Sequence, residues 1–267
     1  MSASGHGETR VLFGVPIDAV SMTEVMDRVD EAIVGRRRLQ IGVVNAAKLV
    51  NMRRDPTLQH SVLSSDLILA DGMAVVWASR ILRAPLPERV AGIDVMTAIL
   101  ERANRLQYRI YCLGATQAVL DAVAVRMAAE YPGARLVGRH HGYFSPEEEP
   151  EVADDIGHSG ADILLVAMTS PKKEEFLARW SDRLGVPVCH GVGGSFDVFA
   201  GKVRRAPAAW QRLGLEWLYR VKQEPARLWK RYLFTNAAFC WMTVREAAGT
   251  LLGAGSGKPA SGADGDR

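Results

Sequence analysis

The 267-residue sequence lacks features that mark several common classes of protein. Its three cysteines, Cys112, Cys189 and Cys240, are far apart and odd in number, which argues against a disulfide framework or a CxxC metal site. No apolar run reaches the roughly 18–20 residues needed to cross a bilayer. The polar first ten residues contain no apolar segment of a secretory signal, so we expect a protein of the reducing cytoplasm. A hydrophobic content of 48% excludes the disordered and fibrous classes.

Several familiar catalytic motifs are also missing. The chain has no HExxH, no GxSxG and no dinucleotide fingerprint, and no Asp-x-Asp clamp for a metal-bound nucleotide occurs before the C-terminal tail. His140 and His141 are adjacent and could bind a metal, but a pair of loop histidines after a strand is the more common outcome. Cys112 and Cys189 lie in apolar runs and are predicted to be core residues. We therefore expect no metal and no cofactor.

The net charge of the chain is small, but its charged residues are unevenly distributed. The net charge is +3, yet residues 202–245 hold ten Lys and Arg against two Glu, a segment charge of +8 that leaves −5 for the rest. Four of the six tryptophans fall in the same segment. Such asymmetry predicts an anionic partner, which can be a nucleic acid, a phosphate-bearing substrate or a membrane surface.

Short apolar runs alternate with helical patterns over the first 200 residues, which predicts βαβ units. We expect an α/β fold with a Rossmann-like parallel sheet covered by helices on both faces, followed by a C-terminal basic helical appendage. The predicted division is a flexible N-terminus (1–10), the α/β core (11–201), the appendage (202–246) and a disordered tail (247–267). The predicted strands are Val11–Val15, Leu39–Val44, Asp66–Ala70, Tyr108–Leu113, Ala134–Val137, Asp162–Met168 and Val186–Cys189.

The basic end reads as two helices, Ala206–Val221 and Ala226–Val244, separated by Pro225. Basic and aromatic residues together are typical of a helix lying on an anionic membrane interface. The alternative is a terminal helix packed on the core with solvated Lys and Arg. No RNA-binding module accompanies the basic residues, so nucleic acid is not the expected partner.

Ligands of parallel α/β folds bind beyond the carboxyl ends of the strands, and polar residues follow two predicted strands there. Asp71, followed by Gly72, can act as a general base, and partial burial would raise its pKa. Asn45 can form a hydrogen bond with a substrate hydroxyl or amide. Each residue can equally be a helix N-cap, and sequence leaves that alternative open.

Other strand-end loops and one arginine complete the candidate site. The loop that begins at Gly114 follows a strand, and Gly193 and Gly194 in the loop before Asp197 can bring backbone amides close to a phosphate. Asp197 can bond a ribose or base. Arg89, between two predicted helices, is suited to clamping a diphosphate, although a surface arginine is more common.

The motifs in this order closely resemble the WecG/TagA/CpsF glycosyltransferases (glycosyltransferase family 26). The resemblance extends from about Val11 to Tyr232. It is carried by Asn45-Ala46, Ser65–Gly72, Pro87–Asp94, Gly191–Asp197, Gly201–Pro207 and Gln211–Arg220.

The resemblance implies an inverting, metal-independent transferase of bacterial cell-surface or exopolysaccharide synthesis. It would move a sugar (N-acetylmannosamine type, glucose or uronic acid) from a UDP-sugar to a polyprenyl-diphosphate-linked sugar, peripherally on the inner face of the plasma membrane. Asp71 matches the family's proposed base, Asn45 a residue near the donor sugar, and Arg89 one facing the diphosphate. Arg220, Arg227 and Lys230 match appendage cations that the family brings over the site on an anionic membrane. A homo-oligomeric state is also possible.

Two positions depart from the family pattern, which usually has Thr at Val43 and Gln at Lys173. A cation in place of a site amide suggests a donor or acceptor bearing a carboxylate. Two rival functions also remain. One is a nucleotide-sugar-modifying enzyme such as an epimerase, and the other is a non-catalytic membrane-associated scaffold of a polysaccharide assembly complex.

Overall fold

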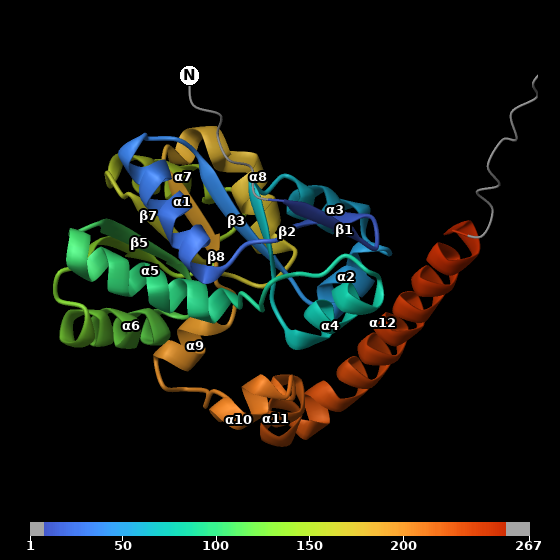
Figure 1. The fold of residues 1–267 in the computed structure, drawn as a ribbon. Helices are drawn as coiled ribbons and strands as arrows, with labels where there is room; N and C mark the ends of the chain where they lie inside the picture. Colours follow the sequence, from blue (N-terminus) through green and yellow to red (C-terminus); the bar gives the residue numbers. More distant parts are fainter. Residues whose placement is uncertain (1–7, 255–267) are drawn as a thin grey trace, which may run out of the picture.

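The computed structural model of the chain describes residues 8–254, apart from the side chains of Arg227, Arg231 and residues 250–254. Its centre is a six-stranded parallel sheet with strand order β4-β3-β8-β7-β5-β6 (Figure 1). The predicted α/β class and the parallel sheet are confirmed. The strands are β3 (Leu39–Val44), β4 (Leu67–Ala70), β5 (Arg109–Gly114), β6 (Arg135–His140), β7 (Ile163–Ala167) and β8 (Val188–Gly191).

Helices cover both faces of this sheet, which explains why its central strands are continuous apolar runs. Successive strand residues point to opposite faces: Val43 belongs to the hydrophobic cluster on one face and Val44 to a cluster on the other. The first face is covered by α1 (Met22–Val34), α5 (Gly92–Leu106), α6 (Gln117–Glu130) and α9 (Ser195–Phe199). The second is covered by α2 (Ala46–Met52), α3 (Pro56–Leu63), α4 (Met73–Ile81), α7 (Glu149–His158) and α8 (Lys172–Leu184).

Local side-chain hydrogen bonds fix the start of α1. Ser21 is the N-cap, and its hydroxyl accepts a hydrogen bond from the Glu24 backbone at 3.4 Å. The Glu24 carboxylate accepts from the Ser21 backbone amide at 2.7 Å, completing a capping box. Cys112 and Cys189 are buried, as predicted, while Cys240 is exposed.

The prediction of a single strand at Val11–Val15 is wrong, because this region forms a hairpin of two strands. β1 (Thr9–Leu12) pairs antiparallel with β2 (Val15–Asp18). The intervening Phe13 and Gly14 have φ values of 56° and 78°, the left-handed conformations of a type I′ turn. Phe-Gly is not a usual signal for that turn, so the sequence pattern hid it. The predicted flexible segment 1–10 therefore overlaps β1, and residues 1–7 lie outside the described part.

The predicted helix Ala206–Val221 is also corrected, since it is two short helices, α10 (Ala208–Arg212) and α11 (Glu216–Gln223). Gly214 separates them with φ of 64°. A Cβ at this position would lie 2.8 Å from both the Met73 Cβ and a Trp77 ring carbon. The turn therefore requires glycine twice, for its conformation and for its close approach to α4.

The last helix, α12 (Pro225–Ala254), continues ten residues beyond its predicted end at Val244. The predicted disordered tail 247–267 is therefore wrong up to Ala254, because the Ala- and Leu-containing stretch before it extends the helix. Residues 255–267 lie outside the described part of the chain. Within residues 8–254, no helix is both long enough and apolar enough to cross a membrane.

The appendage, residues 202–254, packs on the core along α2 and α4 (Figure 1). Phe239 and Met242 of α12 are buried in the same hydrophobic cluster as the β1–β2 hairpin. The Phe239 ring lies 5.2 Å from that of Phe13, and the Phe13 amide donates to the Glu246 carboxylate at 2.9 Å. Core packing, one of the two sequence alternatives for this helix, therefore holds for one of its sides.

The opposite side of α12 is exposed and apolar. We define the apolar stripe as Trp229, Leu233, Phe234, Trp241 and Val244, whose side chains are 48–70% exposed. With 3.6 residues per turn, the five positions fall within about 140° of the helix circumference, so they lie along one side of the helix.

Candidate functional site

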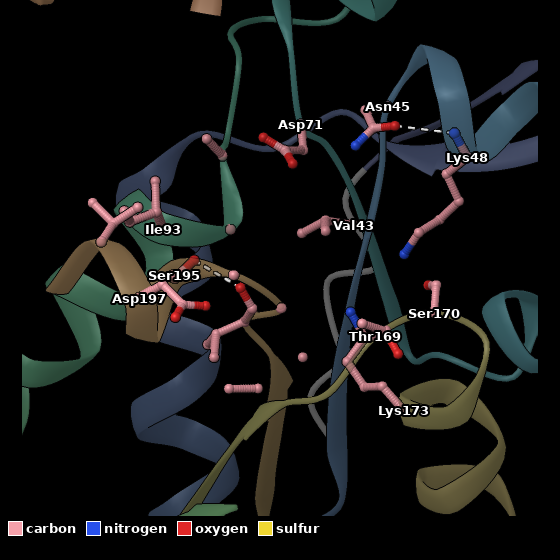
Figure 2. Close-up of a pocket in the computed structure, with 18 of the residues that line it drawn as sticks. Val43, Asn45, Lys48, Asp71, Ile93, Thr169, Ser170, Lys173, Ser195 and Asp197 are labelled. Atoms are coloured by element: carbon pink, nitrogen blue, oxygen red, sulfur yellow. Dashed lines mark hydrogen bonds between the residues drawn. The ribbon is translucent and has the colours of Figure 1, made fainter. Parts of the chain in front are cut away.

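A cavity of about 640 Å³ lies at the carboxyl ends of the sheet strands, where the appendage meets the core. Its walls come from the loops after β3, β4, β7 and β8, shown in Figure 2, and from Arg204, Arg205, Glu216 and Arg220 of the appendage. A second cavity of about 200 Å³ lies between α4, α11 and α12. Both cavities are lined by Asn45, Ala47, Asp71, Glu216 and Arg220.

Asp71 lies at the junction of the two cavities, next to Asn45 at the end of the adjacent strand (Figure 2). Its backbone amide donates to the Val44 carbonyl at 2.8 Å, which continues the pairing of β4 with β3. The N-cap of α4 is Gly72, with φ of 122° and no side-chain capping bond. The N-cap alternative for Asp71 is therefore wrong, and its carboxylate does not cap this helix.

The environment of Asp71 favours a protonatable carboxyl group. Burial raises its pKa, and the nearby Glu216 carboxylate raises it further. Arg220, Arg89 and Lys48 oppose this effect by stabilising the ionised form. A carboxylate balanced in this way can accept a proton from a hydroxyl group and hold it.

Asn45 is the N-cap of α2, so this alternative for its role is confirmed. Its side-chain oxygen accepts from the Lys48 amide at 3.0 Å. The residue also lines both cavities, and a capping role does not prevent its amide group from reaching a ligand.

A buried group of charges forms one wall of the large cavity, and we call Lys48, Lys173 and Glu174 the core cluster. Glu174 Oε1 lies 2.9 Å from Lys48 Nζ and 3.4 Å from Lys173 Nζ, and it also accepts from the Ser170 hydroxyl at 2.7 Å. Figure 2 shows Lys48 extending from α2 toward Ser170. The side chain of Lys173 packs against the backbone of Gly191, since a Cβ at Gly191 would lie 2.6 Å from Lys173 Cδ.

Burial and mutual charge shift the pKa values in the core cluster. Burial favours the neutral form of Glu174, but Lys48 and Lys173 outweigh it and lower the pKa of this carboxyl group to about 2. Burial, together with Lys48, lowers the pKa of Lys173 to about 8. Two ammonium groups therefore share one carboxylate, and the cluster carries an excess positive charge at neutral pH.

The second group of charges, the appendage cluster, contains Arg89, Asp94, Arg205 and Glu216. Arg89 bonds Glu216 at 2.9 Å and Asp94 at 3.0 Å. Arg205 bonds Asp94 at 2.6 Å and lies 4.0 Å from Glu216. Asp94 lies in the first turn of α5, whose N-cap is Ala91. The predicted site residue Arg89 lines the small cavity.

The glycine-rich loop after β8 lines the large cavity with Gly193, Gly194 and Asp197. Gly193 has φ of 53°, and a Cβ at Gly193 or Gly194 would meet no heavy atom within 4 Å. The loop therefore leaves room for a ligand close to its backbone. Asp197 forms an ion pair with Lys202 at 3.1 Å.

Two predicted site residues line neither cavity, and the side chain of a third is not described. Gly114 is not among the residues that line either cavity; a Cβ there would lie 2.5 Å from the Ala167 backbone, so this glycine lets β5 end close to β7. Lys230 is exposed, with its Nζ 5.6 Å from the Trp229 ring centroid, and lines neither cavity. The Arg227 side chain lies outside the described part of the structure.

Sequence reasoning missed Lys48, Arg204, Arg205 and Glu216 as lining residues. A signal was present for each. Lys48 lies one helical turn after Asn45, on the same side of α2. The other three lie within the two C-terminal motifs that carry the family resemblance.

Together the two cavities share a buried carboxylate, that of Asp71, and have several cations on their walls. Such an arrangement suits attack by a hydroxyl group on a substrate whose leaving group is anionic. Across residues 8–254, no group of three or more His, Cys, Asp or Glu side chains is placed to hold a metal ion.

Comparison with known proteins agrees with this geometry. A model of the glycosyl transferase WecG/TagA/CpsF family matches residues 10–251. An N-acetylglucosaminyldiphosphoundecaprenol N-acetyl-β-D-mannosaminyltransferase of Bacillus spizizenii strain W23 is 37% identical over 180 residues, covering 67% of this chain and 69% of the relative. A Bacillus subtilis strain 168 protein of the same name is 33% identical over 227 residues, covering 85% and 88%. The chain belongs to the WecG/TagA/CpsF family of glycosyltransferases.

Proposed function

We propose that the chain transfers a sugar from a UDP-sugar to a polyprenyl-diphosphate-linked sugar. The observation that carries this proposal is the position of Asp71 between two cavities of unlike size. The large cavity has room for a nucleotide sugar, and the small one for the terminal sugar of an acceptor. The names of the two Bacillus relatives support the same pair of substrates.

In the proposed reaction, Asp71 removes the proton from the acceptor hydroxyl as its oxygen attacks the anomeric carbon. The new C–O bond forms on one face of the sugar while the bond to the UDP oxygen breaks on the other, so the anomeric centre is inverted. Arg205 and Arg220, which line the large cavity, stabilise the charge that develops on UDP without a metal ion.

The donor we favour is UDP-linked N-acetylmannosamine, because both relatives are named for that sugar. An acidic sugar is the second candidate, because Lys173 lines the large cavity and belongs to a cluster with excess positive charge.

We also propose that the protein acts peripherally on the inner face of the plasma membrane. The apolar stripe of α12, with Lys230 and Arg245 exposed on the same helix, supports this location. Aromatic and basic side chains of this kind enter the headgroup region of anionic bilayers.

The test is UDP release with a polyprenyl-diphosphate N-acetylglucosamine acceptor, in wild type and in Asp71→Asn. We expect wild-type turnover in the presence of EDTA, and NMR of the product should show the inverted anomer. The variant should lose about 10²–10⁴-fold in kcat, because a positioned base contributes that much. Its affinity for UDP should be unchanged.

The rival functions make different predictions. A nucleotide-sugar-modifying enzyme would convert UDP-sugars with no lipid acceptor, and a scaffold would release no UDP with any acceptor. Near-normal turnover by Asp71→Asn would remove this residue from the mechanism.

A further inference from the structure

Glu216 occupies an unusual position for a carboxylate at the start of a helix. It is the first residue of α11, yet it is bound across the interface by Arg89 at 2.9 Å, and it lines both cavities. An acidic residue in the first turn of a helix is commonly explained by the helix dipole alone. Here the partner is 127 residues away in sequence, so the contact joins the appendage to the core.

The partner of Glu216 is fixed next to Asp71 by the backbone. The Val90 amide donates a hydrogen bond to the Ala70 carbonyl at 3.0 Å. Arg89 precedes Val90 and Asp71 follows Ala70 in the chain, so this backbone bond holds Arg89 close to Asp71. The guanidinium of Arg89 has its two terminal nitrogens on different carboxylates, Glu216 and Asp94. Such a fork fixes the plane of the guanidinium as well as its place.

Glu216 also lies near a second arginine with spare hydrogen-bonding capacity. Arg205 Nη2 is 4.0 Å from Glu216 and bonds Asp94. The Nε atom of Arg205 is buried and makes no hydrogen bond to any residue in the described range. A donor of this kind is available to a ligand oxygen in the cavity that Arg205 lines.

The charge of Glu216 acts on Asp71 directly. Among the charged groups that shift the pKa of Asp71, the carboxylate is that of Glu216 of α11. The cations around Asp71 come from several elements: Lys48 of α2, Arg89 of the α4–α5 loop, Lys173 of α8 and Arg220 of α11. Glu216 raises the pKa of Asp71, whereas Arg220, Arg89 and Lys48 lower it. Without Glu216, burial alone would oppose the cations, the pKa of Asp71 would be lower, and the carboxylate would be a weaker base.

We infer that Glu216 is a positioning residue of the transfer reaction: its carboxylate holds Arg89 and Arg205 in place beside Asp71. The inference rests on the proposed function, in which Asp71 is the base. It assigns Glu216 no contact with substrate, because its carboxylate is already bound to an arginine.

The experiment compares Glu216→Gln and Glu216→Asp with a matched control, Glu246→Gln. Glu246 also joins the appendage to the core, through the Phe13 amide, and lines neither cavity. The measurements are kcat and KM for a polyprenyl-diphosphate N-acetylglucosamine acceptor, the pH profile of kcat/KM, and Tm. An NMR titration of the Asp71 carboxyl carbon, which needs no turnover, accompanies them.

We expect Glu216→Gln to lower kcat at least tenfold and to move the acidic limb of the pH profile and the Asp71 titration to lower pH. Glu216→Asp should restore part of kcat, and Glu246→Gln should leave kcat and both pH curves as in wild type. An unchanged Asp71 titration in Glu216→Gln, or kcat losses that match those of Glu246→Gln, would overturn the inference. Absence of wild-type turnover would refute the proposed function alone, and the titration would still test the influence of Glu216 on Asp71.

Discussion

Two clusters of charged side chains flank Asp71, and they differ mainly in their exposure to solvent. In the core cluster, Lys48, Lys173 and Glu174 have side chains that are 7–11% exposed. In the appendage cluster the side-chain exposure is 14% for Arg89 and 29–31% for its other members. The core cluster has two cations for one anion, and the appendage cluster has two of each.

This difference in exposure suggests that the two clusters have different roles. A buried ion cluster cannot exchange partners without leaving a desolvated charge, so the core cluster is a fixed wall. Ion pairs that water reaches are weaker and can separate at small cost. The appendage cluster therefore suits the side on which the proposed lipid-linked acceptor would enter and leave.

The largest expected effect comes from removing the single anion of the core cluster. Glu174→Gln leaves two buried ammonium groups without a counter-ion, and we expect the free energy of unfolding at pH 7 to fall by about 3–5 kcal/mol. Glu216→Gln, in the appendage cluster, should lower it by at most about 1 kcal/mol. Urea denaturation of both variants tests the comparison, and equal losses would show that the clusters do not differ in the way we propose.

The sequence predicted the framework of the core side well. Strands buried on both faces are continuous apolar runs, so β3 and β4 were recognisable, and the strand-end rule placed Asn45 and Asp71 together. The appendage cluster was not predictable in the same way. Its contacts join residues 89 and 216, and no local pattern records which charges meet across such a distance.

Two further features escaped the sequence analysis for related reasons. The turn at Phe13 and Gly14 depends on a phenylalanine in the left-handed conformation, which residue preferences disfavour. The division of the appendage at Gly214 depends on close contact with Trp77, a residue of the core. In both places tertiary packing decided the local structure.

The next effect concerns His190, a fully buried residue of β8 beside the core cluster. Its Nε2 lies 2.9 Å from the Gly92 carbonyl, and burial, with Lys173 and Lys48, lowers its pKa to about 4. The unfolded chain binds a proton at this residue below about pH 6.5 and the folded chain does not. Stability should therefore fall as the pH drops from 6.5 to 4, by about 3 kcal/mol from this group.

Equilibrium unfolding at several pH values, in wild type and His190→Gln, measures this contribution. The variant should show a shallower loss of stability between pH 6.5 and 4, whereas His60→Gln, at an exposed position of α3, should follow wild type. Below about pH 4.5, protonation of Glu174 becomes possible in the unfolded chain, so its stabilising contribution is lost as the pH falls further toward 2. Parallel curves for wild type and His190→Gln would contradict the assignment.

On the appendage side, the apolar stripe should govern membrane binding. Replacing Leu233 and Trp241, which are 56% and 68% exposed, by serine removes apolar area that would enter the bilayer. At about 1.5–3 kcal/mol for each side chain, binding to vesicles of phosphatidylglycerol and phosphatidylethanolamine should weaken at least tenfold per substitution. Val125→Ser, on the exposed side of α6, is the control. If the double variant sediments with vesicles as well as the wild type does, the docking proposal is wrong.

The smallest effect tests whether the core cluster selects the donor sugar. Lys173 shares Glu174 with Lys48, so only part of its charge is available to a ligand in the large cavity. A carboxylate of the donor would then gain a charge-assisted hydrogen bond at the low end of the usual range, about 1.5 kcal/mol, or roughly tenfold in kcat/KM. The comparison is between UDP-N-acetylmannosamine and its uronic acid, in wild type and in Lys173→Gln. We expect the variant to use the acidic donor about tenfold less well relative to the neutral one, with UDP affinity unchanged. If the ratio is the same in both proteins, Lys173 does not contact the donor sugar, and its role is confined to the wall that Glu174 holds together.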